Sequence, residues 1–188
     1  MKKNMVIRLL SLVLIVVSLS FSTVGASSVG AAATQKINAI VRLGIFKGDP
    51  DGNLRMDEKI IRSELVTAFV RAVGMENDKN KLNLTFKDID STHWAYNFIG
   101  IAVNNGLITG YPDNTVGPDR FITYSEALTL IIRTLGYQEV LSSGNWPDNV
   151  IKKCQELGVI SGSSIPKDKE LTREEVASLI YNALTVEF

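Results

Sequence analysis

The chain contains the same stretch of sequence more than once, and this repetition limits the folds that it can adopt. When the sequence is shifted by 62 residues, residues 44–74 lie over residues 106–136 without a gap, and eleven of the 31 positions are identical. Random pairing on ordinary residue usage gives about two identities. A third copy matches at an offset of 52, with Trp146 over Trp94 and Gly158 over Gly106, and its loop is three residues shorter. The chain is therefore an array of three copies of one small unit.

Each copy has the pattern of two helices joined by a loop. In the second copy, Trp94, Phe98 and Ile101 are spaced as on one helix face. Gly106 stands where a left-handed residue would end that helix. The cluster of Gly, Tyr, Pro, Asp and Asn at residues 110–114 predicts a turn before the second helix.

The second helices are predicted from their caps. Thr123 with Glu126, and Thr172 with Glu175, have the spacing of capping boxes. The first copy has Ile61 in the Thr position, so no side chain can cap that helix. Because a lost cap costs about 1 kcal/mol, we expect this helix start to be the loosest of the three.

The size of one copy determines the predicted architecture. A two-helix unit of about 50 residues is too small to bury a stable core, so three units should pack around a shared centre. We predict an all-α domain with pseudo-threefold symmetry, built from residues 34–78, 84–141 and 142–188. Cys154 falls on the first helix of the third copy, and we interpret it as a small core residue without a redox role.

Residues 1–26 have the composition of an export signal. Three basic residues among the first eight precede the apolar run Leu9–Val17 and a stretch of small residues. Val24–Ala26 and Ala31–Ala33 both fit a cleavage site, so the mature protein should begin near residue 27 or residue 34. An uncleaved N-terminal anchor is the alternative. The apolar run is shorter than the roughly 20 residues of a membrane-spanning helix, so we expect a secreted protein without a membrane span.

Composition and motifs exclude several classes of function. The chain has 20 basic and 20 acidic residues, and without the three basic residues of the signal the balance is 17 to 20, or about −3. Such a chain is not a basic nucleic-acid binder. Its single Cys excludes an internal disulfide framework. The single histidine, His93, belongs to no catalytic motif, so we predict no enzyme and no cofactor.

Residues 49–53, Asp-Pro-Asp-Gly-Asn, resemble the start of a calcium loop. The rest of the EF-hand pattern fails, because Leu54 stands where Gly is needed and Ile60 stands where the bidentate Glu should be. We interpret the segment as a turn and predict no metal site.

The first residue of each second helix carries the most informative signal. This position holds Arg62, Tyr124 and Arg173. The helix dipole disfavours a cation there by about 0.3–1 kcal/mol, which suggests that each Arg meets an anion with the help of free helix amides. From spacing alone, a solvated Arg or one paired with a neighbouring carboxylate is the stronger alternative.

Four motifs of the second copy together resemble the S-layer homology (SLH) repeat. They are Phe86–Asp88, His93–Ala95, Gly106–Asp113 and Ile122–Glu126. The resemblance spans residues 34–188 as three tandem copies. It implies a pseudo-trimer of helices that binds secondary cell wall polysaccharide, often pyruvylated, without a covalent bond and in grooves between repeats. It also implies a place at the cell wall or S-layer on the cell surface.

The resemblance assigns binding roles residue by residue. A guanidinium can hold a pyruvate carboxylate bidentately while a Trp face stacks on a sugar ring. Because Tyr124 replaces the motif Arg in the second copy, that groove is expected to be silent or to stack on sugar only, which leaves one or two working sites. The alternative is a structural or protein-interaction subunit that contacts other envelope proteins. The expected wall-polymer residues are Arg62, Arg173, Asp88, Trp94, Trp146 and Tyr124.

Overall fold

The structure is a computed structural model, and it describes residues 28–48, 51–78, 84–162 and 165–187. The predicted signal peptide lies outside these residues. The helices are α2 (Ser28–Arg42), α3 (Arg62–Ala72), α4 (Tyr96–Asn104), α5 (Tyr124–Thr134), the 3-10 helix η1 (Gln138–Ser142), α6 (Asp148–Glu156) and α7 (Arg173–Leu184). Strand pairing in the described residues is limited to three isolated bridges. The all-α prediction is confirmed.

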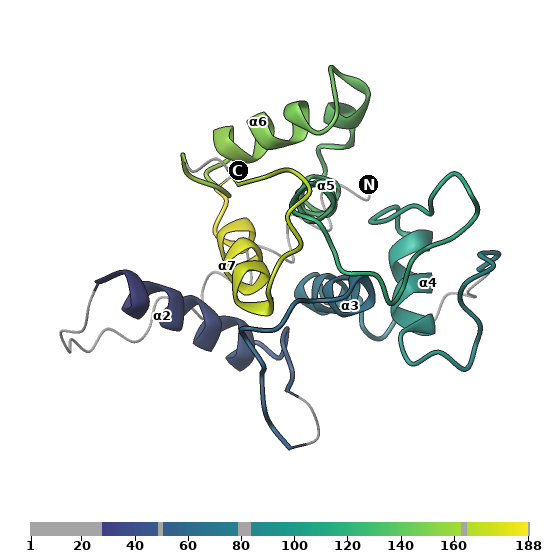
Figure 1. The fold of residues 1–188 in the computed structure, drawn as a ribbon, viewed down its shortest axis with the longest axis horizontal. Coiled ribbons are helices and arrows are strands. Elements are labelled where there is room, and N and C mark those ends of the chain that lie inside the picture. The colour runs from purple at the N-terminus through teal and green to yellow at the C-terminus, as the bar shows by residue number, and fades with distance from the viewer. Residues whose placement is uncertain (1–27, 49–50, 79–83, 163–164, 188) are drawn as a thin grey trace.

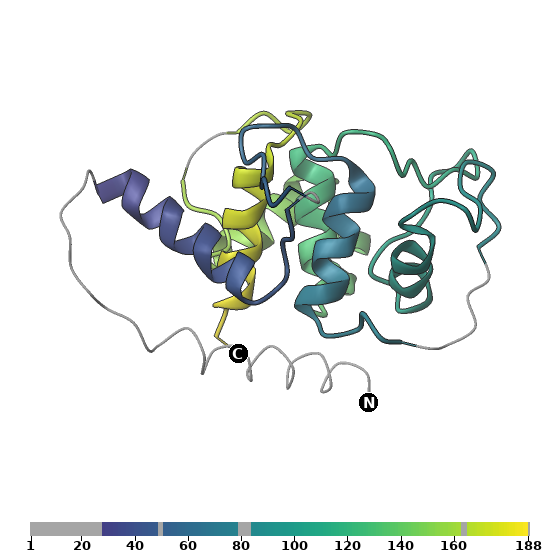
Figure 2. The same ribbon diagram turned by 90° about the horizontal axis from the view of Figure 1, so that it is seen from below.

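The second helices of the three copies form the centre of the molecule. Figure 1 shows α3, α5 and α7 together in the middle, with α2, α4 and α6 around them. Figure 2 shows from a second direction that α3, α5 and α7 lie side by side. Their inward faces are buried, with Val66, Leu128 and Val176 at 0% exposure, so these three helices supply the core of the molecule.

The copies are interleaved, because each first helix packs on a second helix from another copy. Helix α4 packs against α3, α6 against α5, and α2 against α7. No copy therefore buries its own pair of helices as a separate unit. This exchange explains how units of about 50 residues obtain a core: each one completes the packing of its neighbour.

A closed ring of backbone hydrogen bonds joins the three copies just before their second helices. The Ile60 amide donates to the Leu171 carbonyl at 3.0 Å, and the Leu171 amide donates to the Ile122 carbonyl at 3.1 Å. The Ile122 amide then donates to the Ile60 carbonyl at 3.1 Å, which closes the ring. The three residues occupy equivalent positions in the copies, and all are at most 1% exposed. Each of these buried polar groups thus has a partner.

The caps agree with the sequence prediction in the second and third copies. The hydroxyls of Thr123 and Thr172 accept from the amides of Glu126 and Glu175. In the first copy only the reverse bond forms, since the Ile61 amide donates to Glu64 at 3.2 Å and the Ile61 side chain has no oxygen to offer. Whether the start of α3 is looser stays a prediction.

The first helices end as predicted. Gly106 follows α4 with φ of 71°, and Gly44 and Gly158 hold the same place after α2 and α6 with φ of 68° and 70°. A left-handed conformation at this point is inexpensive only for glycine, which explains why the residue recurs in all three copies.

Candidate binding grooves

Two cavities occupy equivalent places in the repeat. Groove A has a volume of about 310 Å³ and groove B of about 320 Å³. The residues of groove A that recur are Phe46, Lys47, Gly48, Glu64, Thr67, Arg71, Trp94 and Arg173. Their counterparts in groove B are Ile108, Thr109, Gly110, Glu126, Thr129, Arg133, Trp146 and Arg62.

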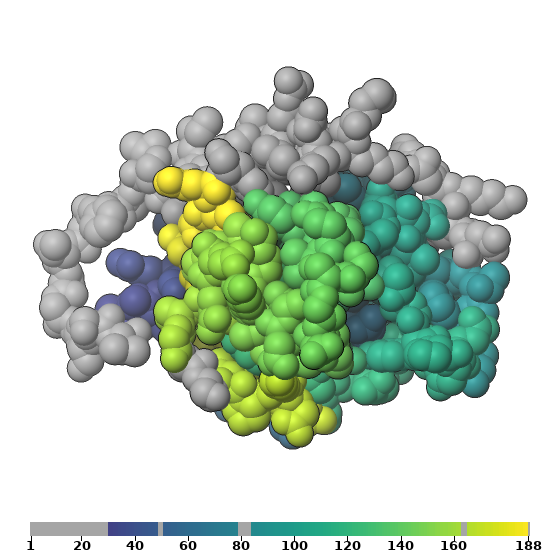
Figure 3. Space-filling model, turned by 90° about the horizontal axis from the view of Figure 1, so that it is seen from above, coloured from purple at the N-terminus to yellow at the C-terminus, as the bar shows by residue number. Residues whose placement is uncertain are grey.

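Each groove is assembled from three copies. In groove B the turn at Thr109 and the helix α5 come from the second copy, Arg62 comes from the first and Trp146 from the third. Figure 3 shows the surface hollowed between the teal and green parts of the chain, with blue atoms of the first copy at the bottom. Because no copy holds a complete set, the grooves depend on the interleaved packing.

In groove B two arginines meet at one turn residue. The Arg62 Nη2 donates to the Thr109 carbonyl at 3.1 Å, and the Arg133 Nη2 lies 3.4 Å from the Thr109 hydroxyl. Arg62 is 7% exposed, and its Nε is buried with no hydrogen-bond partner among the described residues. Burial, and then the positive charge of Arg62, lowers the pKa of Arg133. Two close guanidiniums with unused donors favour an anion.

In groove A the equivalent arginine has a carboxylate partner. The Arg173 Nη1 lies 2.8 Å from Glu64 Oε1, and its Nε donates to the Leu54 carbonyl at 2.8 Å. The guanidinium also stacks over the Phe46 ring at 5.2 Å. Arg71 is the second arginine of this groove, and its Nε lies 3.7 Å from Glu76 Oε1. That Nε is buried and has no hydrogen-bond partner among the described residues.

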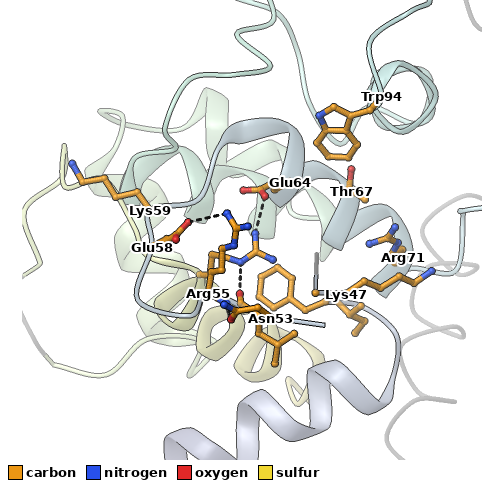
Figure 4. A pocket seen from close by; sticks show the side chains of 14 residues that line it. Lys47, Asn53, Arg55, Glu58, Lys59, Glu64, Thr67, Arg71 and Trp94 are labelled. Carbon is orange, nitrogen blue, oxygen red and sulfur yellow. Dashed lines mark hydrogen bonds and ion pairs between the residues drawn. The ribbon is translucent and has the colours of Figure 1, made fainter. Parts of the chain in front are cut away.

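The two tryptophans of the chain provide one exposed aromatic surface for each groove. Trp94 and Trp146 are both 55% exposed, which is unusual for so large an apolar side chain. Trp146 is fixed by a 3.0 Å hydrogen bond from Nε1 to the Thr129 hydroxyl. Figure 4 shows Trp94 beside Thr67, which is the counterpart of Thr129. The Thr67 hydroxyl is buried and has no hydrogen-bond partner among the described residues.

The helix amides next to the arginines are not free, contrary to the expectation from the sequence. The Arg62 and Arg173 amides donate to the carbonyls of Arg120 and Glu58 at 2.8 and 2.9 Å. The amide of the next residue is also used, as Ser63 shows with the Pro118 carbonyl at 2.9 Å. These bonds join the copies to one another, so the amides at the starts of α3 and α7 are not available to an anion in the grooves.

Two of the predicted wall-polymer residues lie outside both grooves. Asp88 accepts hydrogen bonds from the amides of Val116 and Gly117 at 2.8 and 2.7 Å, so its carboxylate holds a loop. Tyr124 is 2% exposed, so its ring offers no face to a sugar. Of the two expectations for the second copy, this burial favours the silent groove. Burial, together with the nearby Cys154, raises the pKa of Tyr124.

The third junction lacks the features that grooves A and B share. Its counterparts of Arg71 and Thr67 are Asn182 and Ser178. Asn182 is occupied, because its oxygen accepts from Lys36 Nζ at 2.9 Å and its nitrogen donates to the Val159 carbonyl at 2.8 Å. With Tyr124 buried as well, this junction presents none of the arginines that the other two present.

Sequence reasoning missed the second arginine of each groove. Arg71 and Arg133 are among the eleven identical positions of the repeat, as are Thr67 and Thr129. Helical spacing places Arg71 two turns after Glu64 on the same face. The signal that could have identified them is the identity of an Arg and a Thr at these positions in two copies.

Two further kinds of feature were sought in the part of the chain that the structure describes: a metal site and a membrane-spanning helix. Within it, no three side chains of His, Cys, Asp or Glu are grouped closely enough to hold a metal ion. None of its helices has both the length and the apolar character to cross a membrane.

The chain is thus an all-α module made of three interleaved copies, with two equivalent grooves between them. Residues 26–66 and 85–128 match the S-layer homology domain. The chain belongs to the S-layer homology domain family. The match covers parts of the first two copies, and the three repeat boundaries stay predictions.

The relatives are proteins of the bacterial surface. The chain is 32% identical over 166 residues to a surface layer protein of Brevibacillus choshinensis, covering 87% of this chain and 15% of that protein. It is 31% identical over 168 residues to a middle cell wall protein of Brevibacillus brevis, covering 88% and 16%. A cellulosome-anchoring protein of Acetivibrio thermocellus is 34% identical over 106 residues, covering 55% and 24%. The predicted cell-surface location is confirmed by this set.

This chain spans about a sixth of the length of the first two relatives. An endo-1,4-beta-xylanase and an amylopullulanase also match, and the chain spans 11% and 6% of their lengths. The shared part is thus a small portion of each enzyme. This agrees with the prediction that the module itself is not catalytic.

Proposed function

We propose that this chain attaches to the bacterial cell envelope by non-covalent binding of secondary cell wall polysaccharide in grooves A and B. One observation carries the proposal: each groove joins two arginines to an exposed tryptophan, although the three side chains come from different copies. The names of the surface-layer, cell wall and anchoring relatives support the attachment role.

The chemistry of the grooves favours an acidic sugar. An exposed indole such as that of Trp146 offers a flat apolar face to a sugar ring. A pair of guanidiniums suits a carboxylate such as that of a pyruvyl ketal, because planar N–H donors match its two oxygens. The mature chain has a net charge near −3, so its overall field does not attract an anionic polymer. The attraction has to come from the grooves.

The binding roles are proposed for Arg62 and Arg173 with Trp146 and Trp94, to which the structure adds Arg133 and Arg71. The number of working grooves under this proposal is two. The third junction would contribute packing only, since its equivalents are Tyr124, Ser178 and Asn182.

The proposal is tested by sedimentation of the purified protein with cell walls. A variant with Arg62→Gln and Arg173→Gln should lose most of its pelleting, because each groove loses one guanidinium. Arg42→Gln is the matched control, since Arg42 is exposed at the end of α2 and lines neither groove. Undiminished pelleting of the double variant would contradict the role of the arginines.

A structural or protein-interaction role in the envelope is the alternative. Walls from which the acidic substituents have been removed separate the two functions. The proposed function predicts weak binding to such walls. Equal binding to treated and untreated walls would favour the alternative.

A further inference from the structure

The two grooves differ in what their capping glutamate does. Glu64 and Glu126 are equivalent residues at the third position of α3 and α5, and each lines its groove. In each case one carboxylate oxygen accepts a bond from the backbone amide of the cap residue. The other oxygen is the one that can compete with a ligand for the groove arginine.

In groove A this second oxygen is bound to the arginine. Glu64 Oε1 lies 2.8 Å from Arg173 Nη1, and the Arg173 side chain is 11% exposed. A ligand carboxylate must share or displace this partner before it can use the guanidinium fully. The ion pair therefore acts as an internal competitor in groove A.

In groove B a tyrosine takes up the second oxygen. Tyr111 donates its hydroxyl to Glu126 Oε1 at 2.7 Å, while Glu126 Oε2 accepts from the Thr123 amide and hydroxyl at 3.1 and 3.0 Å. Among the described residues, neither Arg62 nor Arg133 has a carboxylate within 4.0 Å. Arg62 keeps its buried Nε without a partner.

Tyr111 is itself held firmly in this position. The guanidiniums of Arg62 and Arg120 both contact its ring, with their Cζ atoms 5.0 and 4.7 Å from the ring centre. Burial raises the pKa of Tyr111 to about 12, so its hydroxyl remains a donor at neutral pH. Burial also raises the pKa of Glu126, but the hydrogen bonds from Tyr111 and Thr123 and the positive charge of Arg62 together outweigh this effect, and the carboxylate stays ionised. Arg62 thus acts on Glu126 through its charge without forming an ion pair with it.

The first copy cannot build the same arrangement. The position equivalent to Tyr111 is Asp49. An ionised carboxylate has no hydrogen to donate, so a side chain of this type cannot hold Glu64 away from an arginine.

We propose that Tyr111 is a positioning residue that withdraws Glu126 from Arg62, and that groove B is consequently the stronger site for the acidic group of the wall polymer. Groove A binds the same group more weakly because Glu64 competes for Arg173. The inference rests on the proposed function and adds a ranking of its two sites.

Single-tryptophan variants allow each groove to be measured separately. Trp94→Phe leaves Trp146 as the reporter of groove B, and Trp146→Phe leaves Trp94 as the reporter of groove A. The probe is methyl glucopyranoside carrying a 4,6-pyruvyl ketal, with its methyl ester as the uncharged control. Tryptophan fluorescence is followed on titration. The acid is expected to bind groove B more tightly than groove A, and the ester to bind both weakly.

Three substitutions then test the mechanism. Tyr111→Phe frees Glu126 to pair with Arg62, so binding in groove B should weaken by about tenfold. Glu126→Gln in that background removes the competing charge, keeps the capping bond, and should restore most of the affinity. Glu64→Gln should tighten binding in groove A by a similar factor.

The outcomes separate this inference from the function on which it rests. Parent affinity in Tyr111→Phe, or no recovery on adding Glu126→Gln, overturns the role of Tyr111 even if the probe binds both grooves. A probe that binds neither groove of the parent proteins overturns the proposed function, and the ranking falls with it.

Discussion

Substitution of Gly110 by Ala should destabilise the protein for a purely steric reason. Gly110 lies in the turn that lines groove B. A methyl group there would overlap the Phe86 ring and lie 2.8 Å from the Thr115 carbonyl oxygen, closer than real contacts of this kind. That oxygen cannot retreat easily, because it accepts the Tyr111 amide at 2.7 Å. Overpacking of this type costs about 1–3 kcal/mol, against a total stability of about 5–15 kcal/mol.

The matched control is Gly106→Ala, where the cause of the destabilisation differs. Nothing lies within 4 Å of a methyl group at Gly106, but φ is 71°, so the expected cost of about 1–2 kcal/mol is backbone strain. Urea unfolding followed by circular dichroism gives the free energy of unfolding of each variant. Adding Phe86→Leu should relieve Gly110→Ala but should add independently to Gly106→Ala. A Gly110→Ala protein as stable as the parent, or strict additivity with Phe86→Leu, would refute the steric account.

Three further predictions concern residues outside the arginine pairs. Cys154 is 0% exposed and burial raises its pKa to about 12, so a thiol reagent should label it only after unfolding, and rapid labelling of the native protein would contradict its core position. Asp88→Asn should lower the free energy of unfolding by about 1.5–3 kcal/mol while wall binding persists, since the charged acceptor of two loop amides is lost. Normal stability with lost binding would instead make Asp88 a ligand residue. Because hydrogen bonds lower the pKa of Glu126 and Glu175 despite burial, their contribution to stability is complete above about pH 4.5 and is lost as the pH falls through the lower native value. Unfolding measured from pH 6 to pH 3 should show this decline, and a flat profile would speak against it.

Much of the fold could be predicted because the same helix and turn signals occur in each copy of the repeat. Glycines such as Gly106 and caps such as Thr123 obey local rules that need no knowledge of the tertiary structure. The sequence could not show that α4 packs on α3 instead of α5, since both partners present apolar faces with the same spacing. Which second helix each first helix contacts depends on how the three copies pack together, so it is known only from the structure.

The site could be predicted only in part, because its residues carry local motifs but come together through contacts between copies. Arg62, Arg173 and the two tryptophans could be named from motifs, and the structure brings each arginine together with a tryptophan from a distant segment. Asp88 was predicted as a binding residue because it belongs to a motif. A motif residue can also serve the structure, as Asp88 does by accepting hydrogen bonds from two loop amides. The helix amides were expected to be free because nothing local reveals that loops from other copies will cover them.

The central claim is that both grooves bind an acidic sugar, and the two tryptophans provide its most direct test. Each of them lines one groove, so Trp94→Phe and Trp146→Phe report groove B and groove A in turn. Purified wall polysaccharide fragments should change the fluorescence of both variants saturably, and fragments stripped of their acidic groups should bind far more weakly. Fluorescence that responds in neither variant, while the protein still sediments with whole walls, would place the binding surface elsewhere and contradict the account.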